Sequence, residues 1–320
     1  MPIKVLVTGA AGFLGCRVIA ALLSDGGDEP KVSRILAADI VPCPVADPRV
    51  DSRTGTILEP AFIASIVEQD VDVVVHLAAV LSGQSESDFD LGLRVNVDAT
   101  RGLLEACRAL RRPPRFVFSS TVAIFGGELP EIVPEDSVLQ PRSSYGTAKA
   151  IAELLVSEYS RRGFIDGISC RLATVTVRPG APNSALSSFV SGIIREPLAG
   201  IDAICPVPLD TRLWVSSPAV VTRNLLHAVQ VPAAALDGRV AVNLPGMCVT
   251  PAQMLASLER VGGVAARARV RCAIDPAVAR VVATWPGALD DRRARRLGFS
   301  GDREFDEIVR QYVDERERER

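Results

Sequence analysis

Short apolar runs alternate with segments of helical periodicity along the first half of the chain. The runs predict buried strands at Ile3–Val7, Arg34–Ile40, Val71–Leu77, Arg115–Phe118 and Gly167–Thr176. The segments between them predict helices at Leu14–Leu23, Ala61–Glu68, Leu93–Leu110 and Ser144–Arg162. Because strands and helices alternate through short connections, the pattern predicts an α/β fold, a doubly wound parallel sheet with helices on both faces.

The second half has a less regular pattern, which prolines interrupt between Arg178 and Pro218. It predicts helices at Val220–Val229, Pro251–Val261 and Phe305–Val313 and a strand at Val240–Leu244. The alternating charges of Asp314–Arg320 predict a solvated, frayed end. We expect residues 1–175 to form one domain and residues 176–320 to form mostly a second, with some segments returning to the first.

Composition restricts the class of protein. Of the 320 residues, 48% are apolar and 23% are charged, as in globular chains. The 36 basic and 38 acidic side chains nearly balance, so no strong field favours nucleic acid or acidic lipid. The seven cysteines are widely spaced, and every apolar run is far shorter than the roughly 20 residues of a membrane span. We therefore expect a soluble, cytoplasmic protein with neither disulfides nor a membrane partner.

A glycine motif follows the first predicted strand and opens the first predicted helix. Gly9 allows a tight turn, Gly12 lets a pyrophosphate approach the backbone, and Gly15 allows close packing of helix and strand. The N-terminus of the helix would then face the phosphates. A generic glycine turn is the alternative, but the strand–turn–helix context favours a dinucleotide.

Asp39 closes the second predicted strand. A carboxylate at this place can accept hydrogen bonds from the adenosine ribose and would repel a 2′-phosphate, so it favours NAD over NADP. A turn aspartate without a ligand is the alternative. The two histidines, His76 and His227, are isolated and make neither a metal site nor a Ser-His-Asp triad. We expect His76 to be a hydrogen-bonded residue at a strand end.

Tyr145 and Lys149 lie four residues apart on a predicted helix and share one face of it. Ser119–Thr121 ends a predicted strand, at the sheet edge where α/β proteins bind ligands. A tyrosine acts as a base near neutral pH only when its phenolate is stabilised, for example by an ammonium group. We therefore expect Tyr145 to be the base, Lys149 to lower its pKa and hold the nicotinamide ribose, and Thr121 or Ser120 to orient the substrate oxygen.

These motifs, together with His76–Ala79, resemble the extended short-chain dehydrogenase/reductase family, often called the NAD-dependent epimerase/dehydratase family. The resemblance covers the whole chain and implies a Rossmann fold with a smaller C-terminal substrate-binding domain. The aromatic–glycine pair Phe125-Gly126 implies that Thr121 is the catalytic hydroxyl. The implied NAD-binding residues are Gly9, Gly12, Phe13, Leu14, Gly15, Asp39, Ile57, Leu77, Ala78, Ala79, Asn96, Tyr145 and Lys149.

Three further stretches, Tyr145–Ala150, Val177–Asn183 and Ser191–Leu198, resemble a group of sugar-acid dehydrogenases within this family. The resemblance implies NAD-dependent oxidation of the C2 hydroxyl of a four-carbon sugar acid, D-erythronate to 2-dehydro-D-erythronate. The expected substrate contacts are Ser82, Ser120, Thr121, Tyr145, Arg178, Asn183 and Arg212. An arginine fork matches a carboxylate, so Arg178 and Arg212 are both candidates for it, although an ordinary ion pair explains either residue equally well.

Two other functions stay open. Val122-Ala123 follows the catalytic threonine where sugar-nucleotide 4,6-dehydratases need an Asp-Glu pair, so elimination of water lacks its acid and base. A nucleotide-sugar epimerase would keep its reduced cofactor and rebind a rotated keto-sugar, which nothing in the sequence excludes. A scaffold that only senses NAD would be expected to have lost Tyr145 or Lys149.

The helices expected near residues 94–110 and 146–161 have apolar or small residues on more than one face. These residues are Leu103, Leu104, Ala148, Ile151, Ala152 and Leu155. One face packs on the sheet, and the other needs a partner. Similar family members pair these helices into a four-helix bundle, which implies a homodimer.

Overall fold

The structure is a computed structural model that describes residues 2–24, 31–180 and 187–318. It divides into two compact units between which the chain passes several times. The first unit comprises Met1–Thr121, Ser144–Arg171 and Thr222–Val242. The second comprises Val122–Ser143, Leu172–Val221 and Asn243–Arg320. The first unit therefore includes a segment from well beyond residue 175, and the second includes a segment from before it.

The first unit is built on a seven-stranded sheet with the order β10-β6-β5-β4-β1-β2-β3. Its strands are β1 (Ile3–Thr8), β2 (Val32–Asp39), β3 (Val50–Thr54), β4 (Val73–His76), β5 (Arg115–Thr121), β6 (Asp166–Leu172) and β10 (Ala241–Asn243). Strand β1 pairs in parallel with both β2 and β4, and β4 with β5 and β2 with β3 are also parallel pairs. The doubly wound parallel sheet is thus confirmed. The pattern missed β3 because its sequence, VDSRT, is polar and half-exposed.

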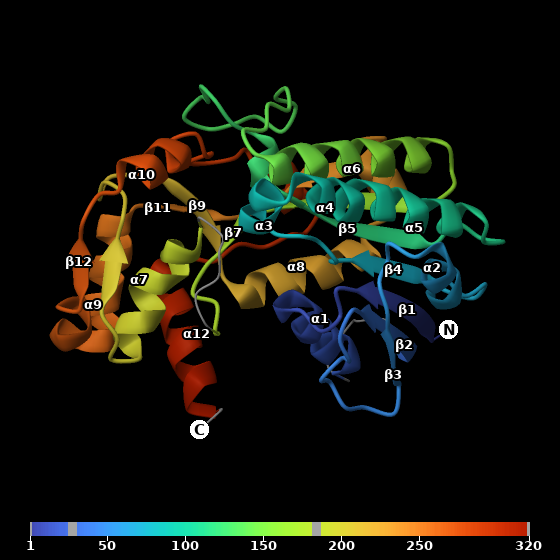
Figure 1. Cartoon of the computed structure of the whole chain (residues 1–320), viewed down its shortest axis with the longest axis horizontal. Helices are drawn as coiled ribbons and strands as arrows, with labels where there is room; N and C mark the ends of the chain where they lie inside the picture. The colour runs from blue at the N-terminus through green and yellow to red at the C-terminus, as the bar shows by residue number, and fades with distance from the viewer. Residues whose placement is uncertain (1, 25–30, 181–186, 319–320) are drawn as a thin grey trace. The chain divides into compact units, whose positions relative to one another are not determined.

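Helices cover both faces of this sheet. They are α1 (Phe13–Leu23), α2 (Pro60–Ile66), α3 (Ser82–Ser87), α4 (Phe89–Leu93), α5 (Ala99–Arg108), α6 (Ser144–Arg161) and α8 (Pro218–Gln230). Figure 1 shows α4, α5 and α6 on one side of the sheet and α1 and α8 on the other. The helix expected at Leu93–Leu110 is divided, because Arg94–Asp98 forms a π-helical turn before α5 begins.

The strand order reverses between β1 and β4, which is the point where open α/β sheets bind ligands. In the register of these strands Thr8 lies beside His76, and His76 lies beside Phe118 of β5. The carboxyl ends of the three strands therefore meet at one edge of the sheet. Whatever follows each strand, the glycine motif included, is brought to that edge.

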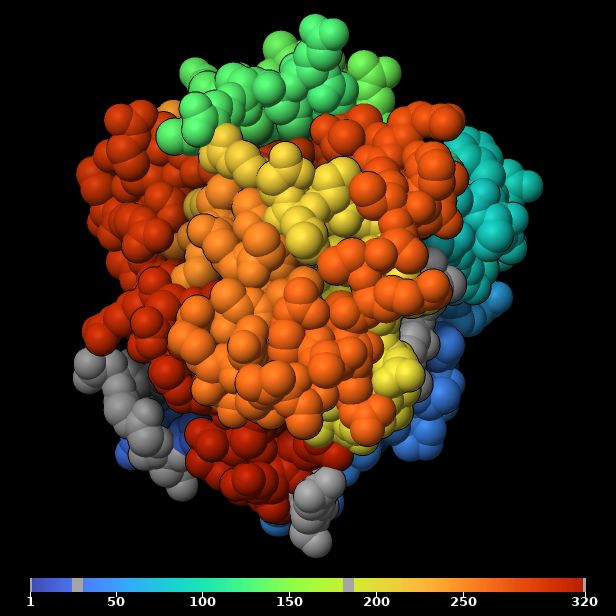
Figure 2. Space-filling model, turned by 90° about the vertical axis from the view of Figure 1, so that its left-hand side faces the viewer, coloured from blue at the N-terminus to red at the C-terminus, as the bar shows by residue number. Residues whose placement is uncertain are grey.

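The second unit contains a three-stranded sheet of β7 (Thr174–Val175), β9 (Leu213–Ser216) and β11 (Met247–Val249). A further pair joins β8 (Ala203–Cys205) to β12 (Val270–Cys272). The helices are α7 (Ser188–Leu198), α9 (Pro251–Arg267), α10 (Pro276–Val282), α11 (Arg292–Arg296) and α12 (Phe305–Arg318). In Figure 2 the C-terminal part of the chain, in orange and red, covers much of this unit's surface. The single strand expected at Gly167–Thr176 is divided between β6 and β7.

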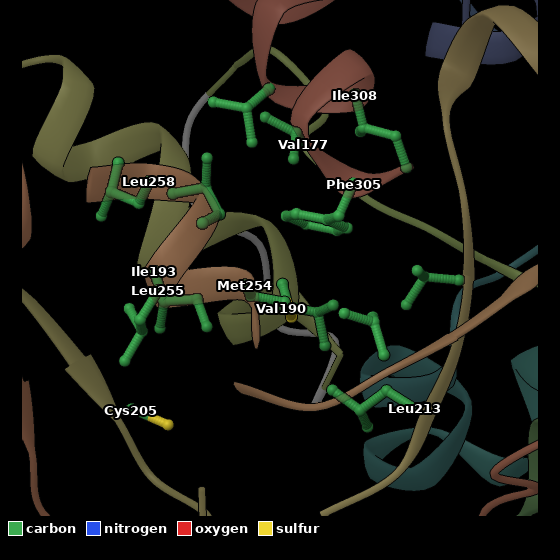
Figure 3. Close-up of a cluster of buried hydrophobic side chains, with 14 of the residues drawn as sticks. Val177, Val190, Ile193, Cys205, Leu213, Met254, Leu255, Leu258, Phe305 and Ile308 are labelled. Carbon is green, nitrogen blue, oxygen red and sulfur yellow. The ribbon is translucent and has the colours of Figure 1, made fainter. Parts of the chain in front are cut away.

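Three helices of the second unit share one apolar core, which Figure 3 shows in close-up. Val190 and Ile193 come from α7, Leu258 from α9 and Phe305 from α12, and all four are buried. The expectation of a frayed tail was wrong, because α12 continues to Arg318. Residues 314–318 are exposed or half-buried, as expected of a solvated end, and Arg316 donates a hydrogen bond to the carbonyl of Leu198 at the end of α7.

Two negative findings concern the described part of the chain. No helix in it is long and apolar enough to cross a membrane. The same residues contain no cluster of three or more histidine, cysteine, aspartate or glutamate side chains suited to a metal ion.

Candidate active site

The glycine motif forms a cradle that side chains would fill. Gly9 has a φ of +71°, and a Cβ added to it would lie 2.7 Å from the backbone nitrogen of Ala78. A Cβ added to Gly15 would lie 2.1 Å from the carbonyl oxygen of Gly9. Gly12 is exposed and begins α1, whose first turn has no acidic residue and starts with Phe13 and Leu14. The bare start of this helix fits the pyrophosphate of a dinucleotide.

Asp39 at the end of β2 is fixed against this cradle. Its Oδ2 accepts a hydrogen bond from the backbone nitrogen of Ala11 at 2.9 Å, and its Oδ1 accepts one from Ile40 at 2.7 Å. The carboxylate is thus oriented by the glycine motif and remains half-exposed, as a group that binds ribose hydroxyls requires. Ile57, one of the implied NAD-binding residues, is buried in the core with Ile63 and presents only 8% of its surface.

The loop after β4 is held by Asn96. The Asn96 side chain accepts a hydrogen bond from the nitrogen of Val80 at 2.9 Å and donates one to its carbonyl at 3.0 Å. Both ends of the amide therefore bind Val80, so the buried Asn96 side chain holds the loop that follows Leu77–Ala79, and its effect on a cofactor would pass through that loop.

His76 is a structural residue, as expected. Its two ring nitrogens bind the hydroxyls of Thr8 and Thr100 at 2.6 and 2.9 Å. Burial, followed by the charge of Lys149, lowers the pKa of His76 to about 3. The ring is therefore neutral at physiological pH and links β1, β4 and the helix α5.

Lys149 places an ammonium group inside the first unit. It is 2% exposed, and its Nζ donates a hydrogen bond to the carbonyl of Ser119 on β5 at 2.9 Å. The Nζ lies 4.6 Å from the centre of the Phe118 ring and 5.9 Å from that of Tyr145. Burial lowers the pKa of Lys149 to about 7. The structure thus brings Tyr145 and Lys149 together beside the end of β5.

Tyr145 begins α6 and is half-buried. Burial raises its pKa to about 12, so in the protein alone burial outweighs the lowering that we expected from Lys149. Burial disfavours the charged forms of both Tyr145 and Lys149, because each loses its hydration. A Tyr145 phenolate and a Lys149 ammonium attract each other, so each charge is less costly when the other is present. Thr121 is also half-buried and ends β5, the strand to which Lys149 ties α6.

Ser120 is not available as the second donor that we expected. It is 2% exposed, and its hydroxyl donates to Oε2 of Glu153 on α6 at 2.8 Å. Oε1 of Glu153 also accepts a hydrogen bond from Nη2 of Arg171 at 2.6 Å, which gives a buried ion pair between α6 and β6. Sequence reasoning missed Glu153, although it follows Lys149 by the same four-residue spacing that identified Tyr145. Along β5, Ser120 points to this ion pair, and Thr121 remains the candidate hydroxyl.

The structure separates the two candidate arginines of the second unit. Arg212 forms an ion pair with Glu131 at 3.0 Å and contacts the Cys248 sulfur, as an ordinary ion-paired residue does. Arg178 is half-buried and forms no ion pair with a carboxylate among the described residues. Burial, together with the charge of Arg195, lowers the pKa of Arg178. Arg178 is therefore the better candidate for an anionic ligand.

Two expected substrate contacts remain. Ser82 is half-buried at the start of α3, in the first unit. Asn183 lies outside the described residues.

Comparison with known proteins agrees with this geometry. Residues 5–215 match the NAD dependent epimerase/dehydratase family. A D-erythronate dehydrogenase from Cupriavidus necator is 48% identical over 98% of both chains, and one from Haemophilus influenzae is 43% identical over 97% of this chain and 99% of its own. A solved structure described as a nucleoside-diphosphate-sugar epimerase from Agrobacterium tumefaciens has a TM-score of 0.93 and 37% identity, and the match covers 98% of this chain and 94% of that one.

The unpaired charge of Lys149 gives a testable stability prediction. The unfolded chain keeps this proton up to about pH 10.5, and the folded chain releases it near pH 7. The free energy of unfolding of the wild type therefore rises with pH between these values, because the unfolded state binds more protons there. Lys149→Met should raise the Tm of the cofactor-free protein by several degrees at pH 6.5, and the gain should shrink toward pH 10. Scanning calorimetry of both proteins at pH 6.5 and pH 10 measures this difference in Tm.

Lys4→Met is the matched control. Lys4 is also buried, but it forms ion pairs with Glu68 and with Asp70, the second at 2.8 Å. Its removal should lower the Tm, since Asp70 loses its partner and Glu68 keeps only its longer contacts with Arg34 and Arg53. A lower Tm for Lys149→Met at pH 6.5 would show that the ammonium stabilises the fold and that our interpretation is wrong.

Proposed function

The chain belongs to the NAD dependent epimerase/dehydratase family and is an oxidoreductase that uses NAD, and we propose that it oxidises the C2 hydroxyl of a four-carbon sugar acid, D-erythronate, to 2-dehydro-D-erythronate. The observation that carries the proposal is full-length similarity to two dehydrogenases of that acid. The positions of Tyr145 and Lys149 support it, because the two groups lie together beside the carboxyl end of β5.

In the proposed reaction Tyr145, as the phenolate, removes the proton from the C2 hydroxyl. Thr121 donates a hydrogen bond to the reacting oxygen and orients it. When bound, NAD supplies the nicotinamide that accepts the C2 hydride. Lys149 stabilises the phenolate and holds the nicotinamide ribose, while the Ser119 carbonyl fixes its ammonium group.

Arg178 binds the substrate carboxylate in this proposal. A guanidinium forms two parallel hydrogen bonds with a carboxylate, and Arg178 has no competing carboxylate among the described residues. Arg212 is the weaker candidate for this role, because it already forms an ion pair with Glu131. Ser82 stays a candidate for a neutral hydrogen bond.

A nucleotide-sugar epimerase is the second candidate, since the Agrobacterium tumefaciens structure carries that description. An absorbance assay separates the two reactions. A dehydrogenase given NAD and D-erythronate accumulates NADH, whereas an epimerase interconverts nucleotide sugars without net NADH. Turnover of nucleotide sugars together with no NADH from any C4 to C6 aldonate would favour the epimerase.

The proposal includes a homodimer, formed through α6. Of the six apolar or small residues named for these helices, four are buried within the protomer, namely Leu103, Leu104, Ala148 and Ala152. Ile151 and Leu154 remain 38% and 62% exposed on α6. Their spacing places them on one face of the helix, where a second copy of α6 would cover them.

Cofactor choice tests the role of Asp39. Wild-type protein should prefer NAD strongly, because the oriented carboxylate repels a 2′-phosphate. Asp39→Ala should reduce the ratio of kcat/KM values for NAD and NADP by at least tenfold, which corresponds to about 1.4 kcal/mol. Steady-state kinetics with both cofactors measures it. Equal kcat/KM values for the two cofactors in the wild type would refute this role.

Removing one hydroxyl tests the base. Tyr145→Phe should lower kcat by about 10²–10⁴-fold and leave the Kd for NAD nearly unchanged, because the ring remains. The wild-type rate should rise with pH, since the deprotonated tyrosine is the active form. Lys149→Met should move this rise to higher pH, because the phenolate loses its positive neighbour. A Tyr145→Phe protein with wild-type kcat would mean that another group is the base.

A charge on α6 tests the dimer. Leu154→Arg should convert a dimer into a monomer at micromolar concentration, because a buried charge at the centre of the interface has no partner. Light scattering gives the mass of each protein. Val264→Arg, at another exposed apolar position, is the control and should leave the mass unchanged. A wild-type monomer would contradict the proposed assembly.

A further inference from the structure

Helix α7 holds the backbone of Arg178 on both sides. The Ser191 hydroxyl accepts a hydrogen bond from the backbone nitrogen of Arg178 at 3.3 Å, and Nη1 of Arg195 donates to its carbonyl oxygen at 2.9 Å. Ser191 and Arg195 are 1% and 7% exposed and lie one turn apart on α7. With both backbone groups satisfied, only the side chain of Arg178 remains to bind something else.

The residue before Arg178 has an unusual backbone. Val177 has a φ of +55°, in the left-handed region that β-branched residues rarely adopt. Its side chain is 2% exposed and packs into the apolar core shown in Figure 3. Burial of Val177 and the two hydrogen bonds from α7 to Arg178 therefore hold Val177 in a conformation that a β-branched residue disfavours, as is common at ligand sites.

Two polar atoms of this cluster are buried without a hydrogen-bond partner in the described structure. They are Nε of Arg178 and Oε2 of Glu196. The other oxygen of Glu196, Oε1, accepts from Nη2 of Arg195 at 2.6 Å. Arg195 thus contacts Arg178 with one arm of its guanidinium and Glu196 with the other. The cluster offers one unused donor and one unused acceptor, and buried groups of this kind normally have partners.

We propose that Glu196 is a specificity residue for the sugar acid, whose hydroxyl donates a hydrogen bond to Oε2 while its carboxylate binds Arg178. This inference rests on the proposed function and adds an acceptor to its carboxylate site. Two arginines and one glutamate carry a net charge of +1, which suits a monovalent acid. An acid without the hydroxyl leaves Oε2 buried and unpaired, and sites built around such a bond reject the deoxy analogue strongly.

Arg195 is a positioning residue in this arrangement, since it holds the backbone carbonyl of Arg178 and the Oε1 of Glu196. Gly192, one turn before Glu196, leaves room beside the free oxygen. A Cβ added at Gly192 would lie 3.3 Å from Oε2. A serine there could donate its own hydroxyl to Oε2 and compete with the substrate.

The test compares kcat/KM for D-erythronate with that for its 3-deoxy and 4-deoxy analogues. Wild-type protein should prefer D-erythronate over one analogue by about 10- to 100-fold, the range expected for a hydrogen bond to a charged group. Glu196→Gln and Gly192→Ser should each reduce this preference, chiefly by lowering kcat/KM for D-erythronate. Glu259→Gln, which removes an exposed carboxylate from α9, should leave all three values unchanged.

The outcomes separate this inference from the proposed function. Absence of turnover with every sugar acid in the wild type would refute the proposed function itself. Turnover without a preference among the three acids, or a loss of equal factor for all three in both variants, would leave that function intact and refute the role of Glu196. The Kd for NAD, measured by NADH fluorescence, should not change in either variant.

Discussion

An ammonium group buried without a carboxylate is the constraint around which the first unit is arranged. Lys149 reaches from α6 to the carbonyl of Ser119 on β5, and this hydrogen bond is its one polar contact in the described structure. The nearest carboxylate on its own helix, Glu153, is already paired with Arg171. The charge of Lys149 therefore remains available to the ring of Tyr145 and to whatever binds at the edge of the sheet. A buried charge without a carboxylate partner costs stability, as strained or destabilised groups at functional sites commonly do.

The second unit contains a comparable arrangement with a different residue. Arg178 is a cation held by its backbone, with its side chain unpaired among the described residues, whereas Arg212 is neutralised by Glu131. Beside Lys149 the ion pair Glu153–Arg171 occupies the carboxylate that could have neutralised the free cation, whereas in the second unit Glu196 uses Oε1 for Arg195 and keeps Oε2 unpaired among the described residues. Lys149 and Arg178 thus remain cations that can meet a ligand.

Local patterns in the sequence predicted the parts that depend on near neighbours. The strand–glycine–helix start and the Tyr145–Lys149 pair could be read from spacing, because each depends on residues close in the chain. Asp39 was identified from its place at the end of a strand, although Ala11, which orients it, lies 28 positions away. The strand β3 was missed since edge strands tolerate polar residues, and α12 was expected to fray because its contact with Leu198 lies far away in the sequence. The roles of Asn96 and Ser120 depend on tertiary partners, Val80 and Glu153, that no local pattern reveals.

The most direct test of the account is the fate of the C2 hydrogen. Purified protein is incubated with NAD and D-erythronate that carries deuterium at C2, and both products are analysed by mass spectrometry. The account predicts one deuterium in NADH, a 2-oxo acid without deuterium and a slower rate than with unlabelled substrate. A product that retains deuterium at C2, with unlabelled NADH, would contradict the assignment of the reacting carbon.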